Sequence, residues 1–339
     1  MEKKTLNFNF SAKTSRSVLT QHDCYIISIS KNNQPDIIGL GEASPLPGLS
    51  IDYDKDFESI LEQYCHQLRS QTLHSSTITQ FIPEQLPSLR FAFETALLDL
   101  EQGGKQQLFN SGFTSGTDSI PINGLIWMGE LSFMQKQVEE KLQQGYHCIK
   151  IKVGSLDFEK EYQLVKSVRE RHSAQELIIR LDANGAYSSS NALSMLKKWK
   201  KLNIHSIEQP IAAGQHNLMT KLCLSSPIAI SLDEELIGVT KATDKMSLLQ
   251  MIKPAYVILK PTLLGGFKAT AEWIHLAQSL SIGWWITSAL ESNIGLNAIA
   301  QFVAQYQPVL HQGLGTGQLY DNNFSTKLTI KSGFMYCTF

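Results

Sequence analysis

The run Ile149-Lys150-Ile151-Lys152-Val153-Gly154 places two lysines inside an otherwise apolar stretch and opens a series of similar runs. Each of the next four runs also carries a charged residue near its end, and these residues are Asp182, Glu208, Asp233 and Lys260. Counted from Lys152, successive members lie 30, 26, 25 and 27 residues apart. Because one strand followed by one helix takes about this many residues, the series predicts parallel βα units.

The pattern of short apolar runs with amphipathic stretches between them continues from residue 119 almost to the end of the chain. Eight such runs favour a closed α/β barrel over an open doubly wound sheet, which would carry a glycine fingerprint after its first strand. The predicted strands are Ile120 to Trp127, Cys148 to Val153, Ile178 to Asp182, Ser206 to Glu208, Ile228 to Asp233, Val257 to Pro261, Trp284 to Ser288 and a weaker one at Gln312 to Gly315.

The residues before the barrel have a different pattern. Short β-like runs from Asn7 to Ala43 predict an antiparallel meander, and apolar residues at helical spacing follow in 53–68 and 89–100. Leu328 to Phe339 alternates like a strand and has no helix after it. We therefore expect an α+β domain over residues 1–118, a catalytic barrel over 119–320, and a C-terminal segment, 321–339, that returns to the first domain.

The composition excludes several classes of function. With 42% hydrophobic and 18% charged residues, the chain can bury a large core, and 30 basic against 31 acidic residues provide no field that favours nucleic acid or a membrane surface. No signal-peptide core or bilayer-length apolar run is present, which predicts a cytoplasmic protein with a small-molecule partner. The five cysteines form no CxxC pair and the nine histidines no HExxH motif, so neither disulfides nor zinc are expected. The pattern specifies no oligomeric state.

The carboxylates at the strand ends predict a metal site. Barrel enzymes place their active sites at the C-terminal ends of the strands, so Asp182, Glu208 and Asp233 should meet on one rim. Three carboxylates form an all-oxygen site, which suits Mg²⁺, with Mn²⁺ as a possible substitute, and leaves positions for substrate oxygens. The alternative, three unrelated salt-bridged residues, fits poorly with the apolar residues that precede each one.

Lysines are expected on both sides of these carboxylates. Lys150 and Lys152 share one face of a strand, and the apolar residues around them favour an inward face over a solvated edge. Repulsion between two ammonium groups and a nearby dication should lower the pKa of one lysine toward neutrality. Lys260 falls on the opposite side of the ring. This arrangement predicts removal of a proton from a carbon next to a carboxylate.

Taken in order, Lys-x-Lys, Asp-x-Asn, Glu-Gln-Pro, Asp-Glu and Lys-Pro resemble the muconate-cycloisomerase-like subgroup of the enolase superfamily. The resemblance covers nearly the whole chain. It implies a modified (β/α)8-type barrel, (β/α)7β, with an α+β capping domain whose mobile loop is similar to residues 39–48. It also implies a role for eight residues: catalytic Lys152 and Lys260, the metal ligands Asp182, Glu208 and Asp233, and the supporting residues Lys150, Asn184 and Glu234.

Three further segments, 259–266, 287–296 and 313–317, most resemble the dehydratases of that subgroup. These enzymes convert a hydroxylated cyclohexadiene carboxylate into an aromatic acid for menaquinone biosynthesis. The resemblance implies that Lys152 takes the α-proton and delivers it to the departing hydroxyl, while Lys260 stabilises the enediolate. Ser288, Gly265 and Gly266 are then candidates for contacting the substrate.

Alternatives from two classes remain. A dipeptide epimerase or N-acylamino-acid racemase of the same subgroup would exchange protons through both lysines. The epimerases resemble one another in an acidic pair near the eighth strand, where this chain has no acid in 313–317. A muconate cycloisomerase is less expected. A non-catalytic binding protein would be expected to have lost one of the five charged positions, and all five are present.

Overall fold

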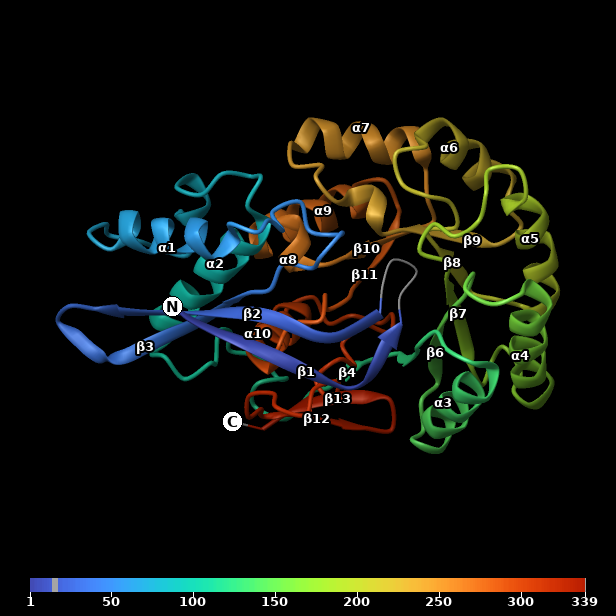
Figure 1. Ribbon diagram of the computed structural model, residues 1–339, viewed down its shortest axis with the longest axis horizontal. Coiled ribbons are helices and arrows are strands. Elements are labelled where there is room, and N and C mark those ends of the chain that lie inside the picture. Colours follow the sequence, from blue (N-terminus) through green and yellow to red (C-terminus); the bar gives the residue numbers. More distant parts are fainter. Residues whose placement is uncertain (14–17, 339) are drawn as a thin grey trace.

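The computed structural model describes residues 1–13 and 18–338, which form an α+β domain beside a barrel (Figure 1). The barrel helices form an outer arc around the parallel strands, and the long N-terminal strands lie across the opposite side of the molecule. The capping domain and the barrel each have a cluster of buried apolar side chains. None of the helices in the described ranges is long and apolar enough to cross a lipid bilayer.

The N-terminal domain is a three-stranded antiparallel sheet with helices packed against it. Its elements are β1 (Glu2–Lys13), β2 (Val18–Lys31), β3 (Gln34–Ala43), α1 (Phe57–Leu68), the 3-10 helix η1 (Ile78–Gln80) and α2 (Pro87–Glu101). Strand β3 lies very close to α2 because two of its residues are glycines. A Cβ atom at Gly41 would be 1.9 Å from the carbonyl oxygen of Ala92, so only glycine fits there.

Seven parallel strands form the wall of the barrel, in sequence order. They are β5 (Gly124–Ile126), β6 (Cys148–Lys152), β7 (Ile178–Asp182), β8 (Ser206–Glu208), β9 (Ala229–Leu232), β10 (Tyr256–Leu259) and β11 (Gly283–Ile286). The register pairs Lys152 with Asp182, and Asp182 with Glu208, so their Cα atoms lie side by side on neighbouring strands. Such in-register strand ends are what place distant charged residues on one rim.

Helices follow each strand and cover the outside of the barrel. They are α3 (Leu131–Gln143), α4 (Phe158–Arg171), α5 (Ala192–Trp199), α6 (His216–Ser225), α7 (Ala242–Ile252), α8 (Pro261–Leu264), α9 (Gly266–Ser279) and α10 (Asn293–Ala304), with the 3-10 helices η2 (Lys200–Leu202) and η3 (Glu234–Leu236). Their buried residues recur at three- and four-residue spacing, as in α4, where Leu164, Val165 and Val168 face the strands.

The barrel is closed by the weak eighth run. Gln312 forms a parallel bridge with Ile122 at one side, and Gly313 forms one with Thr287 at the other. The backbone N–H of Asn123 donates to Gln312 O at 2.9 Å, and that of Ser288 donates to Gly313 O at 3.0 Å. Seven βα units and a final strand-like segment without a helix make this a (β/α)7β barrel, as predicted.

The first predicted barrel strand, Ile120 to Trp127, is wrong as one continuous element. It divides into β4 (Ile120–Pro121) and β5, and β4 pairs outside the barrel with β13 (Phe334–Cys337). Proline has no N–H to donate, so the chain changes partners at Pro121 rather than continuing one ladder. The predicted runs ending at Asp233, Pro261 and Ser288 also extend past the last strand residue, because Asp233 and Ser288 lie in the segments after their strands and Pro261 begins α8.

The C-terminal segment contacts the molecule in two places. Residues 319–322 lie against β1, where the N–H of Asn9 donates to Leu319 O at 2.9 Å and that of Asp321 to Asn7 O at 3.0 Å. The strand predicted at Leu328 to Phe339 is a hairpin of β12 (Leu328–Lys331) and β13, which pairs with β4 near the start of the barrel. Phe339 lies outside the described residues. The domain boundaries at 118 and 320 remain predictions.

Candidate active site

The C-terminal ends of β6 to β10 bring the predicted charged residues together inside the barrel. Asp182 and Glu208 are each 1% exposed and Asp233 is 2% exposed. The apolar strand residues before them, such as Leu181 and Ile207, are also buried, so the carboxylates have little access to water. Charged groups this deeply buried require partners.

Lys150 provides one of those partners. Its Nζ lies 2.9 Å from Asp182 Oδ2, and 3.0 and 2.9 Å from Glu208 Oε1 and Oε2. A single ammonium group therefore stands between two of the predicted metal ligands. Its position follows from the strand geometry. Lys150 and Lys152 are two residues apart on β6, so both side chains point to the same, inward face.

The two predicted catalytic lysines lie at opposite ends of the row of carboxylates. Lys152 Nζ is 3.1 Å from Asp182 Oδ2 and donates to Asn184 Oδ1 at 2.7 Å. Lys260 Nζ donates to Asp233 Oδ2 at the other end. Asn184 is itself held by Glu234, whose Oε1 accepts from Asn184 Nδ2 at 3.1 Å. Six of the eight residues implied by the resemblance are thus joined by direct contacts, and Asp233 and Lys260 form a separate pair at the neighbouring strand ends.

The oxygen atoms of this network suit a hard divalent cation. Asp182, Glu208 and Asp233 lie on three neighbouring strands and offer only carboxylate oxygens, the donor type that Mg²⁺ prefers. Within the ranges that the structure describes, no three acidic, histidine or cysteine side chains are grouped so that they could hold a metal ion, and an ammonium group stands between Asp182 and Glu208. The residues therefore fit Mg²⁺ in donor chemistry, with the lysines balancing the carboxylate charge.

The pKa shifts follow from burial and from this charge pairing. Burial, together with the nearby charge of Asp182, raises the pKa of Glu208 to about 8. Burial also acts to raise the pKa of Asp182, but the ammonium groups of Lys150 and Lys152 outweigh it and hold that pKa below its usual range. Burial acts to lower the pKa of Lys150, yet the charges of Asp182 and Glu208 raise it overall.

Lys260 behaves in the same way, since the Asp233 and Glu208 charges overcome the effect of burial and raise its pKa. The prediction was a lowered pKa for one lysine of the Lys150 and Lys152 pair, and Lys150 is not that lysine, because the carboxylates that face it raise its pKa.

Residues of the N-terminal domain cover the end of the barrel where these charges lie. Leu46, in the predicted cap loop, belongs to a small buried apolar cluster with Leu263 of α8 and with Ala289 from the loop after β11. On the other side, the rings of Phe10 and Trp127 lie 5.6 Å apart, and Lys152 Nζ is 5.9 Å from the centre of the Trp127 ring. The charged network is thus bordered by apolar side chains, which exclude water.

The three candidate substrate contacts have different surroundings. Ser288 Oγ lies 2.6 Å from Thr316 Oγ1 in the loop that closes the barrel. Gly266 lies against Glu94 of α2, and a Cβ atom there would be 2.1 Å from Glu94 Oε2. The Glu94 carboxylate accepts from the N–H groups of Phe267 and Lys268, so Gly266 makes room for a cap on α9. Gly265, at φ +98, ends α8.

Several supporting residues were missed in the sequence analysis. Glu161 of α4 accepts from the N–H groups of Gly154 and Leu156, each at 2.9 Å, and so fixes the loop after Lys152. Glu42 of β3 accepts from the N–H groups of Ser292 and Gly295, both at 2.8 Å, at the start of α10. Their only sequence signal is an acidic residue beside apolar ones, and it does not identify a partner.

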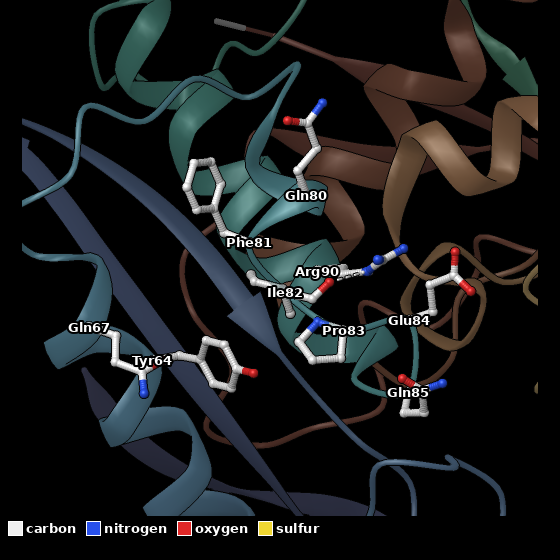
Figure 2. Close-up of a pocket in the computed structure, with 9 residues that line it drawn as sticks. All are labelled: Tyr64, Gln67, Gln80, Phe81, Ile82, Pro83, Glu84, Gln85 and Arg90. Carbon is white, nitrogen blue, oxygen red and sulfur yellow. Dashed lines mark hydrogen bonds between the residues drawn. The ribbon is translucent and has the colours of Figure 1, made fainter.

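A separate cavity lies in the capping domain, between α1 and the start of α2 (Figure 2). It has a volume of about 470 Å³ and is lined by residues that include Tyr64, Phe81, Glu84 and Arg90. The Arg90 side chain donates to Ile82 O at 2.8 Å and to Thr79 O at 2.9 Å, which holds the loop before α2. None of the predicted site residues lines this cavity.

Comparisons with known proteins agree with this fold and site. Residues 134–338 match the family described as enolase C-terminal domain-like. The o-succinylbenzoate synthase of Desulfotalea psychrophila is 45% identical over 359 aligned positions, which cover 97% of this chain and 96% of that protein. The crystal structure of MenC from the same organism has a TM-score of 0.88 at 42% identity, over 99% of this chain and 98% of that one.

The L-Ala-D/L-Glu epimerase of Bacillus subtilis, solved with substrate, has a TM-score of 0.84 at 20% identity, over 99% of this chain and 94% of that one. At this identity the likeness shows the fold alone. The family match and the full-length similarity together show that the chain belongs to the o-succinylbenzoate synthase family of the enolase superfamily.

Proposed function

We propose that this chain catalyses the syn-dehydration of 2-succinyl-6-hydroxy-2,4-cyclohexadiene-1-carboxylate to 2-succinylbenzoate, as a step of menaquinone biosynthesis. The observation that carries the substrate is the similarity to the Desulfotalea synthase over nearly the whole chain. The observation that supports the reaction class is a pair of lysines at opposite ends of three buried carboxylates.

Lys152 is the proposed acid–base residue. In its neutral form it removes the proton from the carbon that carries the substrate carboxylate, and that C–H electron pair becomes part of an enediolate. Lys152, now an ammonium, then donates this proton to the hydroxyl leaving from the neighbouring ring carbon on the same face. The C–O bond breaks, water departs and the ring becomes aromatic. Asn184 accepts a hydrogen bond from Lys152 and so orients it toward the substrate.

Lys260 is the proposed electrostatic partner, and it moves no proton in this reaction. Its ammonium group, held by Asp233 at the far end of the carboxylates, places a positive charge where the enediolate oxygens develop negative charge. The raised pKa of Lys260 favours this role, because an ammonium that keeps its proton stabilises an anion without being consumed.

Asp182, Glu208 and Asp233 are the proposed ligands of Mg²⁺, or of Mn²⁺ as a substitute. Once bound, the cation would neutralise charge on the carboxylate oxygens of the substrate. Lys150 and Glu234 are proposed to support these residues, Lys150 by its contacts to Asp182 and Glu208.

Ser288, Gly265 and Gly266 remain proposed substrate contacts. The nearly equal numbers of acidic and basic residues support a small-molecule substrate, with neither nucleic acid nor a membrane as partner. The cytoplasm is the proposed location.

A dipeptide epimerase or N-acylamino-acid racemase is the second candidate function, since the fold and both lysines are compatible with it. The segment Gly313 to Gly317 has no acidic residue to bind a substrate ammonium group, and its Thr316 is already paired with Ser288. This favours dehydration of the cyclohexadiene acid over dipeptide epimerisation, and the assay below separates dehydration from N-acylamino-acid racemisation.

The deciding experiment is an assay of the purified chain with Mg²⁺, on the cyclohexadiene substrate and on panels of dipeptides and N-succinylamino acids. We expect formation of 2-succinylbenzoate, detected by its aromatic absorbance. Turnover of dipeptides alone would replace the proposed reaction by epimerisation.

A further inference from the structure

Gln209 directly follows the proposed ligand Glu208, and its backbone conformation is unusual. Its φ is +39°, in the left-handed region that residues other than glycine seldom adopt, and its side chain is 0% exposed. A residue keeps such a conformation only where the surrounding structure fixes it, and such positions cluster at functional sites.

The side-chain amide of Gln209 makes four hydrogen bonds that join two strand ends. Its Nε2 donates to Ile211 O at 3.0 Å and to Glu235 Oε2 at 3.0 Å. Its Oε1 accepts from the backbone N–H groups of Asp233 at 3.2 Å and of Glu235 at 3.4 Å. One side chain that starts beside Glu208 on β8 thus bonds directly to the backbone of the second ligand, Asp233, after β9.

Glu235 anchors the other end of this connection. Its Oε1 accepts from the backbone N–H of Gly214 at 3.0 Å and lies 3.0 Å from His216 Nε2, both in the segment that follows β8. The chain after β9 is therefore held to the chain after β8 by Gln209 and Glu235 together. An ionised carboxylate in place of this amide could still accept from the two backbone N–H groups, but it could not donate to the Glu235 carboxylate.

We propose that Gln209 is a positioning residue that sets the separation of Glu208 and Asp233, so that both carboxylates can bind one divalent cation. The inference rests on the proposed metal site and assigns no contact between Gln209 and substrate. Groups that hold metal ligands by hydrogen bonds commonly contribute 10- to 100-fold, in rough terms, to metal affinity.

The chain offers a matched control in Gln301. This side chain is also 0% exposed and makes four amide hydrogen bonds to other residues. Its partners are the N–H groups of Leu108 and Phe109, the carbonyl of Gln106 and the side chain of Asn297, none of which is a proposed ligand. A Gln→Glu change at either position replaces a donor by an acceptor at equal burial. At position 209 the new oxygen faces the Glu235 carboxylate, and at position 301 it faces the neutral oxygens of Gln106 and Asn297.

The experiment measures Mn²⁺ affinity by electron paramagnetic resonance for the full-length chain, Gln209→Glu and Gln301→Glu, with circular dichroism to confirm folding. We expect Mn²⁺ to bind Gln209→Glu about 10- to 100-fold more weakly than wild type, and Gln301→Glu within about twofold of wild type. In Gln209→Glu with Glu235→Gln the donor and acceptor exchange places, and we expect at least half of the lost affinity, on a logarithmic scale, to return.

Two results would overturn the inference while leaving the metal site intact: wild-type affinity in Gln209→Glu, or an equal loss in Gln301→Glu. A wild-type chain that binds no Mn²⁺ would overturn the metal site and this inference together. If Gln209→Glu does not fold, Glu235→Gln replaces it as the test variant, because it disrupts the same contact from the other side. Unchanged affinity in that variant would equally reject the positioning role.

Discussion

Both carboxylate oxygens of Glu208 lie within 3.0 Å of the Lys150 Nζ, although 58 residues separate the two in sequence. Lys150→Met should therefore leave the buried Glu208 carboxylate without its ammonium partner, beside an Asp182 that keeps only Lys152. We expect unfolding free energy to fall by about 3–5 kcal/mol in metal-free buffer, and Mg²⁺ to restore more stability in the variant than in wild type.

Urea unfolding with and without MgCl₂ measures both effects. Lys166→Met is the control, since Lys166 is an exposed residue of α4 in a surface pair with Glu170. This control should lose less than about 1 kcal/mol. Equal losses in the two variants would mean that Lys150 does not neutralise the buried carboxylates.

Lys152→Ala should abolish dehydration while the protein stays folded. Removal of a positioned acid–base group lowers kcat by roughly 10²–10⁴-fold, and Lys152 is proposed to act twice in the reaction. Lys260→Ala should also lower kcat, through loss of the charge that faces the enediolate. The measurement is steady-state formation of 2-succinylbenzoate, with the exposed Lys160→Ala as control. Full activity in both Lys152→Ala and Lys260→Ala would contradict the catalytic roles proposed for these two lysines.

Glu94 should make stability depend on pH. Burial raises its pKa to about 7 from an unfolded value of 4.5, so the folded protein holds this proton more tightly than the unfolded chain. Its contribution is fully present below pH 4.5, declines as pH rises, and is lost once pH passes about 7. The linked change is on the order of 3 kcal/mol.

Glu94→Gln removes that titration. Urea unfolding at pH 5 and pH 8 should show a smaller difference between the two pH values in the variant than in wild type. The other buried acids, such as Glu291, titrate in both proteins and cancel in this comparison. Identical pH dependence in the two proteins would show that Glu94 keeps an ordinary pKa in its place at the start of α9.

Glu161→Gln should weaken the loop after Lys152. The backbone N–H of Gly154 lies 2.9 Å from both Glu161 oxygens, so one of them must become an NH₂ group that faces a donor. We expect a loss of about 2 kcal/mol in stability and a fall in kcat, because this loop fixes the end of β6. Glu159→Gln, on the same helix but exposed, is the control. The prediction fails if thermal unfolding and kcat match those of the control.

The sequence predicts the barrel well where a strand is short, apolar and followed by a charged residue. Ile178–Asp182 and Ser206–Glu208 match the observed β7 and β8, because buried parallel strands carry continuous apolar runs. The division of the first run at Pro121 could not be predicted from its apolar pattern, which is similar in both halves. The halves differ only in pairing, since β4 pairs with β13 and β5 pairs with β6.

Side-chain partners were the least predictable part of the site. The sequence placed Lys150 beside the carboxylates, but the choice of Asp182 and Glu208 as its partners depends on strand register and side-chain length. Gln209 lies between Glu208 and Pro210 in the sequence motif. Its role, however, depends on a left-handed backbone conformation and on a hydrogen bond to Asp233, 24 residues away. Interactions of this kind arise only after the strands have assembled.

The two helix caps supplied by the N-terminal domain, Glu42 on α10 and Glu94 on α9, also bear on how such proteins can be recombined. A barrel grafted onto the N-terminal half of a relative keeps these helix starts satisfied only if the donor carries acidic side chains at the same two places. Chimaeras should therefore fail or succeed according to those two inherited residues, even when every residue around the reacting carbon is retained.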